Sequence, residues 1–192
     1  MAKYVYVDNS NVWIEGRKVA AVARDWAFDV WDATNNNILD REWKYDFGKL
    51  LELVGGKKNG LKKAMLFGSR PPQNDSLWNA AHRHGFEVVV ENRNARDHEK
   101  KIDTGIAVQM VADSFQLITD KTQDEMVLVA GDADYVPALK NIANRGIKIT
   151  VAFWEHASNE LKEAAAEFIS LDRFVDQLKR DKIAVHNPNS DE

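Results

Sequence analysis

Short apolar runs alternate with helical patterns along most of this chain. Five runs are rich in β-branched or aromatic residues and are apolar rather than alternating: residues 4–7, 62–69, 85–92, 125–132 and 146–154. A short, continuous apolar run is typical of a strand that is buried on both faces. The sequence therefore predicts a sheet of about five strands.

Residues with helical spacing fill the stretches between these runs. The expected helices lie at 46–54, 74–85, 101–118, 134–146 and 158–168. Strands that alternate with helices form βαβ units, whose right-handed crossovers place helices on both faces of a mainly parallel sheet. We therefore predict the α/β class, as a three-layer α/β/α sandwich with a Rossmann-like central sheet.

The length of 192 residues, of which 44% are hydrophobic, fits a single domain with a sizeable core. Residues 17–45 are long for one strand-to-helix connection and are rich in tryptophan, so we expect an insertion there. Its tryptophans either pack on the domain or pair with a second subunit in a homo-oligomer. The polar stretch 181–192 is expected to be a disordered tail, which leaves 1–180 as the domain.

Composition and charge narrow the functional classes. The chain has no cysteine, which excludes disulfides, thiolate metal sites and cysteine nucleophiles and suits a reducing cytoplasm. It shows neither a signal peptide nor the ~20 apolar residues of a membrane span, so we expect a cytoplasmic protein without a membrane partner. The net charge of −4 does not attract nucleic acid, so any such binding needs a local basic patch.

Acidic side chains stand where two of the predicted strands end. Asp8 ends the first run and precedes Asn11, while Asp132 and Asp134 follow the fourth run. Ligands bind beyond the carboxyl ends of the strands in an open parallel sheet, which favours a site at this edge. A purely structural interpretation stays open, in which Asp134 caps a helix and Asp132 belongs to a turn.

A further carboxylate falls within the apolar arc of the expected helix 101–118. At ~100° per residue, Asp103 shares this arc with Ile106 and Met110, which should face the sheet. A carboxylate in such an arc is costly unless it is paired, protonated or bound to a metal. Alternatively, the helix begins at Asp103 and the side chain only caps it.

Convergence of these acids at one edge indicates a metal site. Carboxylates in one cleft repel each other, and a hard divalent cation relieves that repulsion. All-oxygen ligands without cysteine favour Mg²⁺ or Mn²⁺ over Zn²⁺, and such sites commonly carry out phosphoryl chemistry. The acids concerned are Asp8, Asp103, Asp132 and Asp134.

Three motifs follow one another along the chain: "VDNSNVW", "EKKID" and "AGDADYVPAL". They resemble the motifs of the NYN domain family, a branch of the PIN-like nuclease superfamily, and the resemblance extends from about residue 3 to residue 171. It implies a PIN-like fold and a metal-dependent endoribonuclease whose catalytic and metal-holding centre is formed by the four acids. It also implies that Asn11 steadies a metal ligand or a substrate phosphate and that Lys100 contacts phosphate.

One departure from the family pattern suggests a second function. The family often carries another acid six residues after Asp103, where this chain has Gln109. Asp113 lies one turn further along and substitutes for that acid only in part. The alternative is therefore an RNA-binding or regulatory adaptor module with a weakened or inactive metal site.

Several side chains near the expected acidic edge suit single-stranded or loop RNA. Basic residues there either hold the RNA backbone or are ordinary solvated charges. Trp13 and Trp154 either stack on bases or pack in the core. The basic residues are Arg70, Arg93, Arg96, Lys100 and Lys101.

Two other metal-site families fit the opening motif less well. An adhesion-type site needs a hydroxyl where this chain has Val12, which cannot ligate a metal. A haloacid-dehalogenase-like phosphatase needs a second aspartate where Ser10 stands. We therefore rank both below a nuclease.

Overall fold

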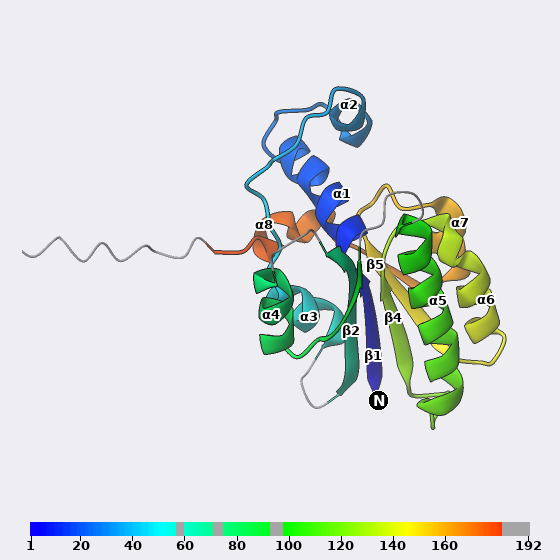
Figure 1. Ribbon diagram of the computed structural model, residues 1–192. Coiled ribbons are helices and arrows are strands. Elements are labelled where there is room, and N and C mark those ends of the chain that lie inside the picture. The colour runs from blue at the N-terminus through cyan, green and yellow to red at the C-terminus, as the bar shows by residue number, and fades with distance from the viewer. Residues whose placement is uncertain (57–59, 71–74, 93–97, 182–192) are drawn as a thin grey trace, which may run out of the picture.

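The computed structural model describes residues 1–56, 60–70, 75–92 and 98–181 (Figure 1). Its strands are β1 Lys3–Asp8, β2 Leu61–Arg70, β3 Glu87–Asn92, β4 Glu125–Val129, β5 Lys148–Phe153 and β6 Glu167–Ser170. Its α-helices are α1 Asn9–Val22, α2 Val30–Asn35, α3 Phe47–Gly55, α4 Ser76–Arg83, α5 His98–Gln116, α6 Val136–Ala143, α7 Asn159–Ala164 and α8 Val175–Leu178. Two short 3-10 turns are η1 Ala133–Tyr135 and η2 Asp172–Phe174.

The strands form one parallel sheet in the order β3-β2-β1-β4-β5-β6. The predicted α/β class and parallel sheet are confirmed. The chain builds the sheet outward in one direction from β1 and then in the other from β4, so the order reverses between these two strands. Ligands bind at such a switch point, beyond the carboxyl ends of the strands.

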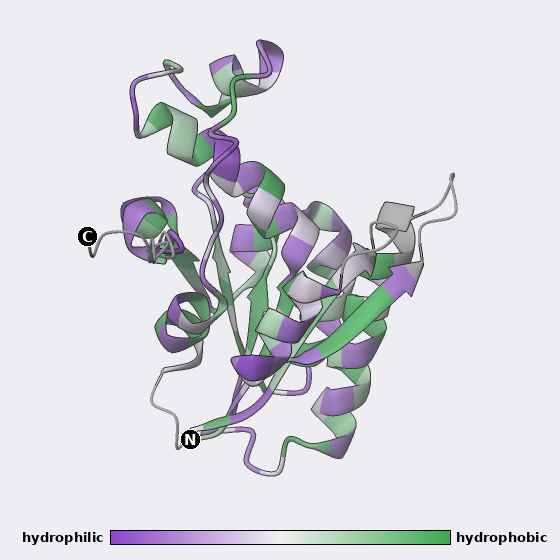
Figure 2. Cartoon of the chain, turned by 60° about the vertical axis from the view of Figure 1, so that its left-hand side comes forward, coloured by the Kyte–Doolittle hydropathy of each residue, from purple (hydrophilic) through white to green (hydrophobic). Residues whose placement is uncertain are grey.

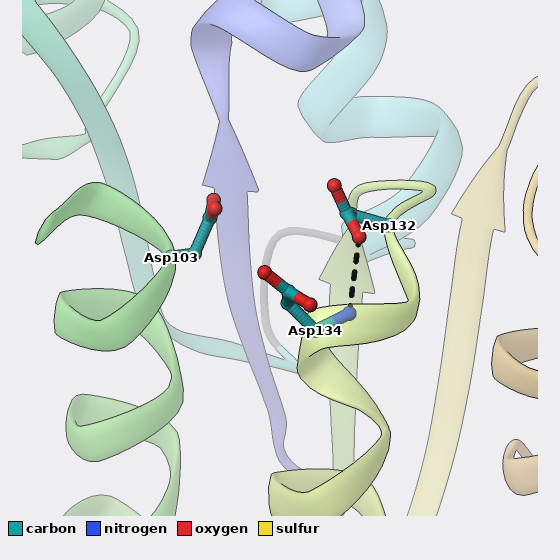
Figure 3. A group of neighbouring side chains, drawn as sticks. All are labelled: Asp103, Asp132 and Asp134. Carbon is teal, nitrogen blue, oxygen red and sulfur yellow. Dashed lines mark hydrogen bonds between the residues drawn. The ribbon is translucent and has the colours of Figure 1, made fainter. Parts of the chain in front are cut away.

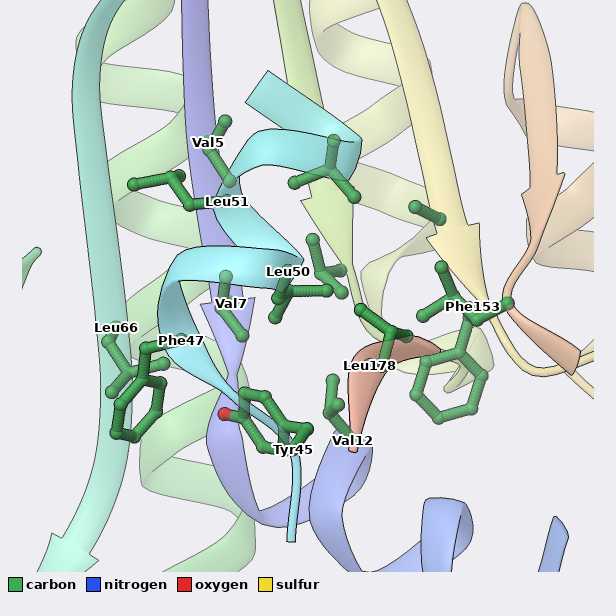
Figure 4. Packing of buried hydrophobic residues seen from close by; sticks show 14 of the residues in the cluster. Val5, Val7, Val12, Tyr45, Phe47, Leu50, Leu51, Leu66, Phe153 and Leu178 are labelled. Atoms are coloured by element: carbon green, nitrogen blue, oxygen red, sulfur yellow. The ribbon is translucent and has the colours of Figure 1, made fainter. Parts of the chain in front are cut away.

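Alternate residues of β1 point to opposite faces of the sheet and supply two separate cores. Val5 and Val7 belong to one core, which Figure 4 shows, while Tyr4 and Tyr6 belong to the other. Figure 2 shows the consequence, since the strands are mostly green and purple residues lie on the helices around them. A strand buried on both faces reads as a continuous apolar run, as β1 does in the sequence.

Helices cover both faces of the sheet, as predicted (Figure 1). Apolar residues of α1, α3, α4 and α8 pack in the core of Val5 and Val7. Residues of α5, α6 and α7 pack in the core of Tyr4 and Tyr6. The sheet therefore forms the middle layer of a three-layer α/β/α sandwich.

The sixth strand was not predicted. The sequence pattern indicates a helix over 158–168, but α7 ends at Ala164 and Ala165 is already extended. β6 then pairs with β5, where Phe168 lies opposite Val151. The alanine-rich run favours a helix locally, but pairing with an open sheet edge overrides that preference.

The segment predicted to be an insertion rises from the sheet edge on α1 and carries α2 at its tip (Figure 1). Trp26 and Trp31 are exposed there. The chain then returns to the body at Trp43, which is fully buried, packs edge-on against Trp154 and donates its indole N–H to the Val175 carbonyl at 3.0 Å. This tryptophan anchors the end of the segment to the domain.

Among the residues that the structure describes, every helix is too short or too polar to span a membrane.

We predict opposite effects on stability for alanine at two helical glycines. A Cβ at Gly16 would overlap the indole rings of Trp43 and Trp154, whereas a Cβ at Gly105 would meet no atom within 4 Å. Gly16→Ala should lower the free energy of unfolding by about 1–3 kcal/mol, because the buried rings must move. Gly105→Ala should raise it by about 0.5–1 kcal/mol through helix propensity.

Urea unfolding of both variants and the parent protein checks this prediction. Equal effects of the two substitutions would contradict the packing of Trp43 against α1.

Candidate metal centre

α1 begins directly after β1, with no intervening loop, and Asp8 joins the two elements. Asp8 is the last residue of the strand and the N-cap of the helix, and its Oδ1 accepts the backbone N–H of Asn11 at 3.0 Å. Asn9 and Ser10 belong to the first turn of α1, a helix that was not among those expected from the sequence. Asn9 is buried, and its Oδ1 accepts the Tyr45 hydroxyl at 2.7 Å.

Asn11 ties the start of α1 to the end of β4. Its Oδ1 accepts the backbone N–H of Gly131 at 2.9 Å. A Cβ at Gly131 would overlap the ring of Phe153, so this close approach requires glycine. Asn11 thus fixes the backbone one residue before Asp132.

Asp132 and Asp134 lie at the turn that follows β4. Asp132 caps η1, and its Oδ1 accepts the backbone N–H of Asp134 at 3.0 Å (Figure 3). The sequence suggested that Asp134 was the cap, but Asp134 lies inside η1 and Asp132 takes the capping position. Both side chains are exposed, so their free oxygens face solvent.

Asp103 lies in the second turn of α5 and not at its start. Because α5 begins at His98, the interpretation of Asp103 as a helix cap is wrong. Its arc of α5 also carries the buried residues Ile106 and Met110, as predicted. Oxygen atoms of Asp103, Asp132 and Asp134 all lie within 4.8 Å of one another (Figure 3).

The hydroxyl of Tyr135 joins Asp8 to this acidic cluster. It lies 3.1 Å from Asp8 Oδ2 and 2.8 Å from Asp103 Oδ1. Tyr135 is fully buried, and its single proton can be donated to only one of the two carboxylates at a time. Sequence reasoning gave this residue no role.

The carboxyl groups raise each other's proton affinity. Burial and, to a smaller extent, the charge of Asp103 together raise the pKa of Asp8 to about 6, against the hydrogen bonds from the Asn11 N–H and the Tyr135 hydroxyl that lower it. Partial burial, together with the charges of Asp132 and Asp134, raises the pKa of Asp103. Burial and the two carboxylates also raise the pKa of Tyr135 far above its usual range, so it stays a hydroxyl. A bound cation would relieve this repulsion.

The arrangement of these carboxylates is therefore suitable for binding a hard divalent cation. Three carboxylates from two separate segments offer oxygen atoms close together, and two of the three are open to solvent. Oxygen donors of this kind suit Mg²⁺, Mn²⁺ and Ca²⁺.

Gln109 and Asp113 belong to a hydrogen-bond network beside the core and do not contribute to the acidic cluster. Asp113 is buried and accepts bonds from the Tyr6 hydroxyl at 2.8 Å, the Lys63 ammonium at 2.8 Å and the Gln109 amide at 2.9 Å. Lys63 lies opposite Tyr4, which places this network towards the amino ends of the strands. Asp113 is therefore not available to replace the missing acid, contrary to the partial substitution that the sequence suggested.

The structure describes the predicted RNA-binding residues only in part. Arg93 lies outside the described residues, as do the side chains of Arg70 and Lys100. Trp154 is fully buried and donates its indole N–H to the Val12 carbonyl at 3.1 Å, so it packs in the core and does not stack on bases. Trp13 is 37% exposed and lies under the guanidinium of Arg17.

We predict that Asp8→Asn makes the stability of the metal-free protein less dependent on pH. Asparagine can still cap α1 and accept from Tyr135, but it does not titrate. Because the pKa of Asp8 is raised to about 6, this carboxyl stabilises the fold at low pH, and that contribution is lost as pH rises through about 6. The parent protein should therefore lose up to about 3 kcal/mol more than the variant between pH 4 and pH 7.5.

Urea unfolding in EDTA across this pH range is the measurement. Parallel curves for the parent protein and Asp8→Asn would show that Asp8 titrates normally.

We also predict that Tyr135→Phe destabilises the metal-free protein. The substitution keeps the buried ring but removes the donor that Asp8 and Asp103 share. Leaving a buried acceptor unsatisfied costs about 1–3 kcal/mol, so the free energy of unfolding at pH 7.5 should fall by that amount. In the Asp8→Asn background, Tyr135→Phe should lower the free energy of unfolding by less, because only the Asp103 carboxylate then remains to lose its donor. Equal losses in both backgrounds would contradict the energetic coupling between Tyr135 and Asp8.

Comparison with known proteins gives few relatives. The NYN domain pattern matches residues 29–172, a range that includes Asp103, Asp132 and Asp134 but begins after Asp8. No curated protein matches the chain in sequence.

Two solved structures resemble the fold to different degrees. One is a protein of unknown function, VPA0982, from Vibrio parahaemolyticus, with a TM-score of 0.64 and 18% identity over 88% of this chain and 92% of that chain. The other is the Vibrio vulnificus NanR protein complexed with ManNAc-6P, with a TM-score of 0.33 and 10% identity over 82% of this chain and 49% of that chain, which is too low to support an argument. The first shows the fold alone, while the NYN pattern covers most of the sequence. The chain therefore belongs to the NYN domain family, a family of PIN-like domains that are typically nucleases.

Proposed function

We propose that this protein is a metal-dependent endoribonuclease that hydrolyses phosphodiester bonds in RNA. The observation that carries the proposal is the meeting of Asp103, Asp132 and Asp134 at the switch point of the sheet, with oxygen atoms within 4.8 Å. These acids come from α5 and from the turn after β4, so only the fold brings them together. Their position in an NYN domain supports nuclease chemistry over a purely structural role.

We propose Mg²⁺ or Mn²⁺ as the cofactor and all four predicted acids as the centre. When bound, such a cation lowers the pKa of a water molecule and stabilises negative charge on a phosphate. Asp103, Asp132 and Asp134 hold the cation, because their free oxygens lie closest together. The Tyr135 hydroxyl, which also contacts Asp8, orients Asp103 from the buried side of the cluster. Asn11 fixes the backbone that carries Asp132.

The exposure of the cluster supports a polymeric substrate. Asp132 and Asp134 are exposed, so a phosphodiester in a single strand or loop of RNA can approach without entering a deep pocket. Because the protein carries a net charge of −4, basic side chains near the acidic cluster must attract the RNA backbone. Arg70, Arg93 and Lys100 remain the proposed backbone contacts on sequence grounds.

An RNA-binding adaptor is the second candidate, and Gln109 favours it. The family's additional acid is absent at this position, and the Gln109 amide is already bonded to Asp113. A centre with fewer carboxylates binds cations more weakly, which would leave RNA binding without efficient cleavage. Activity at physiological Mg²⁺ concentration distinguishes the two functions.

The test is cleavage of a mixed pool of labelled single-stranded and stem–loop RNA by the purified protein in Mn²⁺ or Mg²⁺. We expect products with internal cuts, loss of cleavage in EDTA and recovery when Mn²⁺ is restored. Asp132→Asn and Asp103→Asn should each reduce the cleavage rate by at least about a hundredfold, because each removes a carboxylate that holds the cation.

Glu52→Gln is the matched control. Glu52 is an exposed carboxylate on α3, a helix of the opposite layer from α5, so its removal should leave cleavage unchanged. Chelator-insensitive RNA binding without any cleavage would support the adaptor instead. Full activity of a folded double variant lacking both Asp103 and Asp132 carboxylates would refute the metal centre.

A further inference from the structure

From Thr104 onward, the outward face of α5 carries no charged side chain; Lys100 and Lys101 come before this stretch, and their side chains lie outside the described residues. From Thr104 to Ile118 the only charged residue is Asp113, which is buried. Val108 and Phe115 are 62% and 61% exposed on this face. A surface helix normally presents charged or polar residues to solvent, so an apolar outward face indicates that another surface covers it.

The residues of this face follow the spacing of a helix–helix seam. The face consists of Thr104, Gly105, Val108, Ala112 and Phe115, and Val111, which is partly buried against the core, lies at its margin. Positions 105, 108, 112 and 115 repeat at intervals of three and four, as do positions 104, 108, 111 and 115. This is the spacing at which one helix packs along another.

We propose that two copies of this protein form a dimer by packing their α5 helices antiparallel across a two-fold axis near residues 109 and 110. In this arrangement Phe115 of each copy meets Thr104 and Gly105 of the other, and Val108 meets Val111 and Ala112. Each large side chain lies opposite a small one, so the face is complementary to itself, as a two-fold interface requires. Nothing lies within 4 Å of the Gly105 Cβ position, which leaves room for the ring.

Charge complementarity selects the antiparallel direction. Among the described side chains, the amino end of α5 carries Asp103 beside Asp132 and Asp134, while at its other end the guanidinium of Arg145 stacks on Phe115 at 3.3 Å. Antiparallel helices bring each Arg145 towards the acidic end of the partner and also pair the helix dipoles favourably. A parallel pair would place the two acidic clusters side by side and the two Phe115 rings against each other.

The size of the face predicts a weak dimer. Residues 104–115 cover about 18 Å of helix, which buries less than the ~800 Å² per partner of a standard stable interface. We therefore expect association that depends on protein concentration in the micromolar range.

The exposed aromatic residues near α2 form a rival surface for self-association. Trp26, Phe28 and Trp31 are 55%, 90% and 69% exposed. However, this segment presents Asp25, Asp29 and Asp32 with no lysine or arginine between residues 25 and 40, so two copies of this surface would repel each other; the fourth aspartate, Asp40, is buried and paired with Arg24. The α5 face has no exposed acidic side chain between Thr104 and Phe115.

Sedimentation velocity over a roughly hundredfold range of concentration tests the dimer. The parent protein should shift from monomer to dimer as its concentration rises. Val108→Glu, at an exposed position, should weaken association at least about tenfold because it buries an unpaired charge. Phe28→Glu is the matched control, and it should associate like the parent protein. Thermal unfolding of each variant verifies that it is folded.

Disulfide cross-linking tests the direction of the helices, because the native chain has no cysteine. The double variant Val108→Cys with Ala112→Cys should form a covalent dimer under oxidation, since residues 108 and 112 of opposite copies meet. Val108→Cys alone should cross-link much less. A protein that stays monomeric throughout, association lost in Phe28→Glu but not in Val108→Glu, or equal cross-linking of the single and double variants would overturn the proposal.

Discussion

The pairing of β1 with β4 is the constraint on which the rest of the structure depends. The two strands are neighbours in the sheet although more than 110 residues separate them, and Val7 lies opposite Val129. This register brings Asp8 level with the turn that carries Asp132 and lets Asn11 bond Gly131. It also sets the switch point, where the sheet order reverses and the carboxyl ends leave an open edge. A shift of one residue in this register would separate the acids and reverse both cores.

The same pairing concentrates negative charge, which costs stability unless other groups compensate. Tyr135 compensates inside the protein, because its hydroxyl lies between Asp8 and Asp103 and cannot itself ionise at ordinary pH. The exposed oxygens of Asp132 and Asp134 leave the rest of the compensation to solvent or to a cation. The negative charge of the site is thus stabilised by the Tyr135 hydroxyl on its buried side and by solvent or a cation on its exposed side.

Sequence reasoning identified those features that depend on local pattern. The apolar runs predicted five of the six strands, and the rule for parallel sheets placed Asp8, Asp132 and Asp134 at one edge. It missed β6, because an alanine-rich segment such as 163–166 carries no local sign that a sheet edge is free beside it. It also gave Tyr135 no role, because an aromatic residue next to a strand normally belongs to the core, and only the fold shows what its hydroxyl reaches.

The direct junction of β1 and α1 has a consequence for how this site can change. Because Asp8 ends the strand and caps the helix at once, the connection has no spare residue to absorb an insertion or deletion. Adding one residue there would rotate α1 by about 100° and carry Asn11 away from Gly131. Variation in this part of the chain is therefore confined to substitutions, while length differences can be accommodated farther along, between α1 and Trp43.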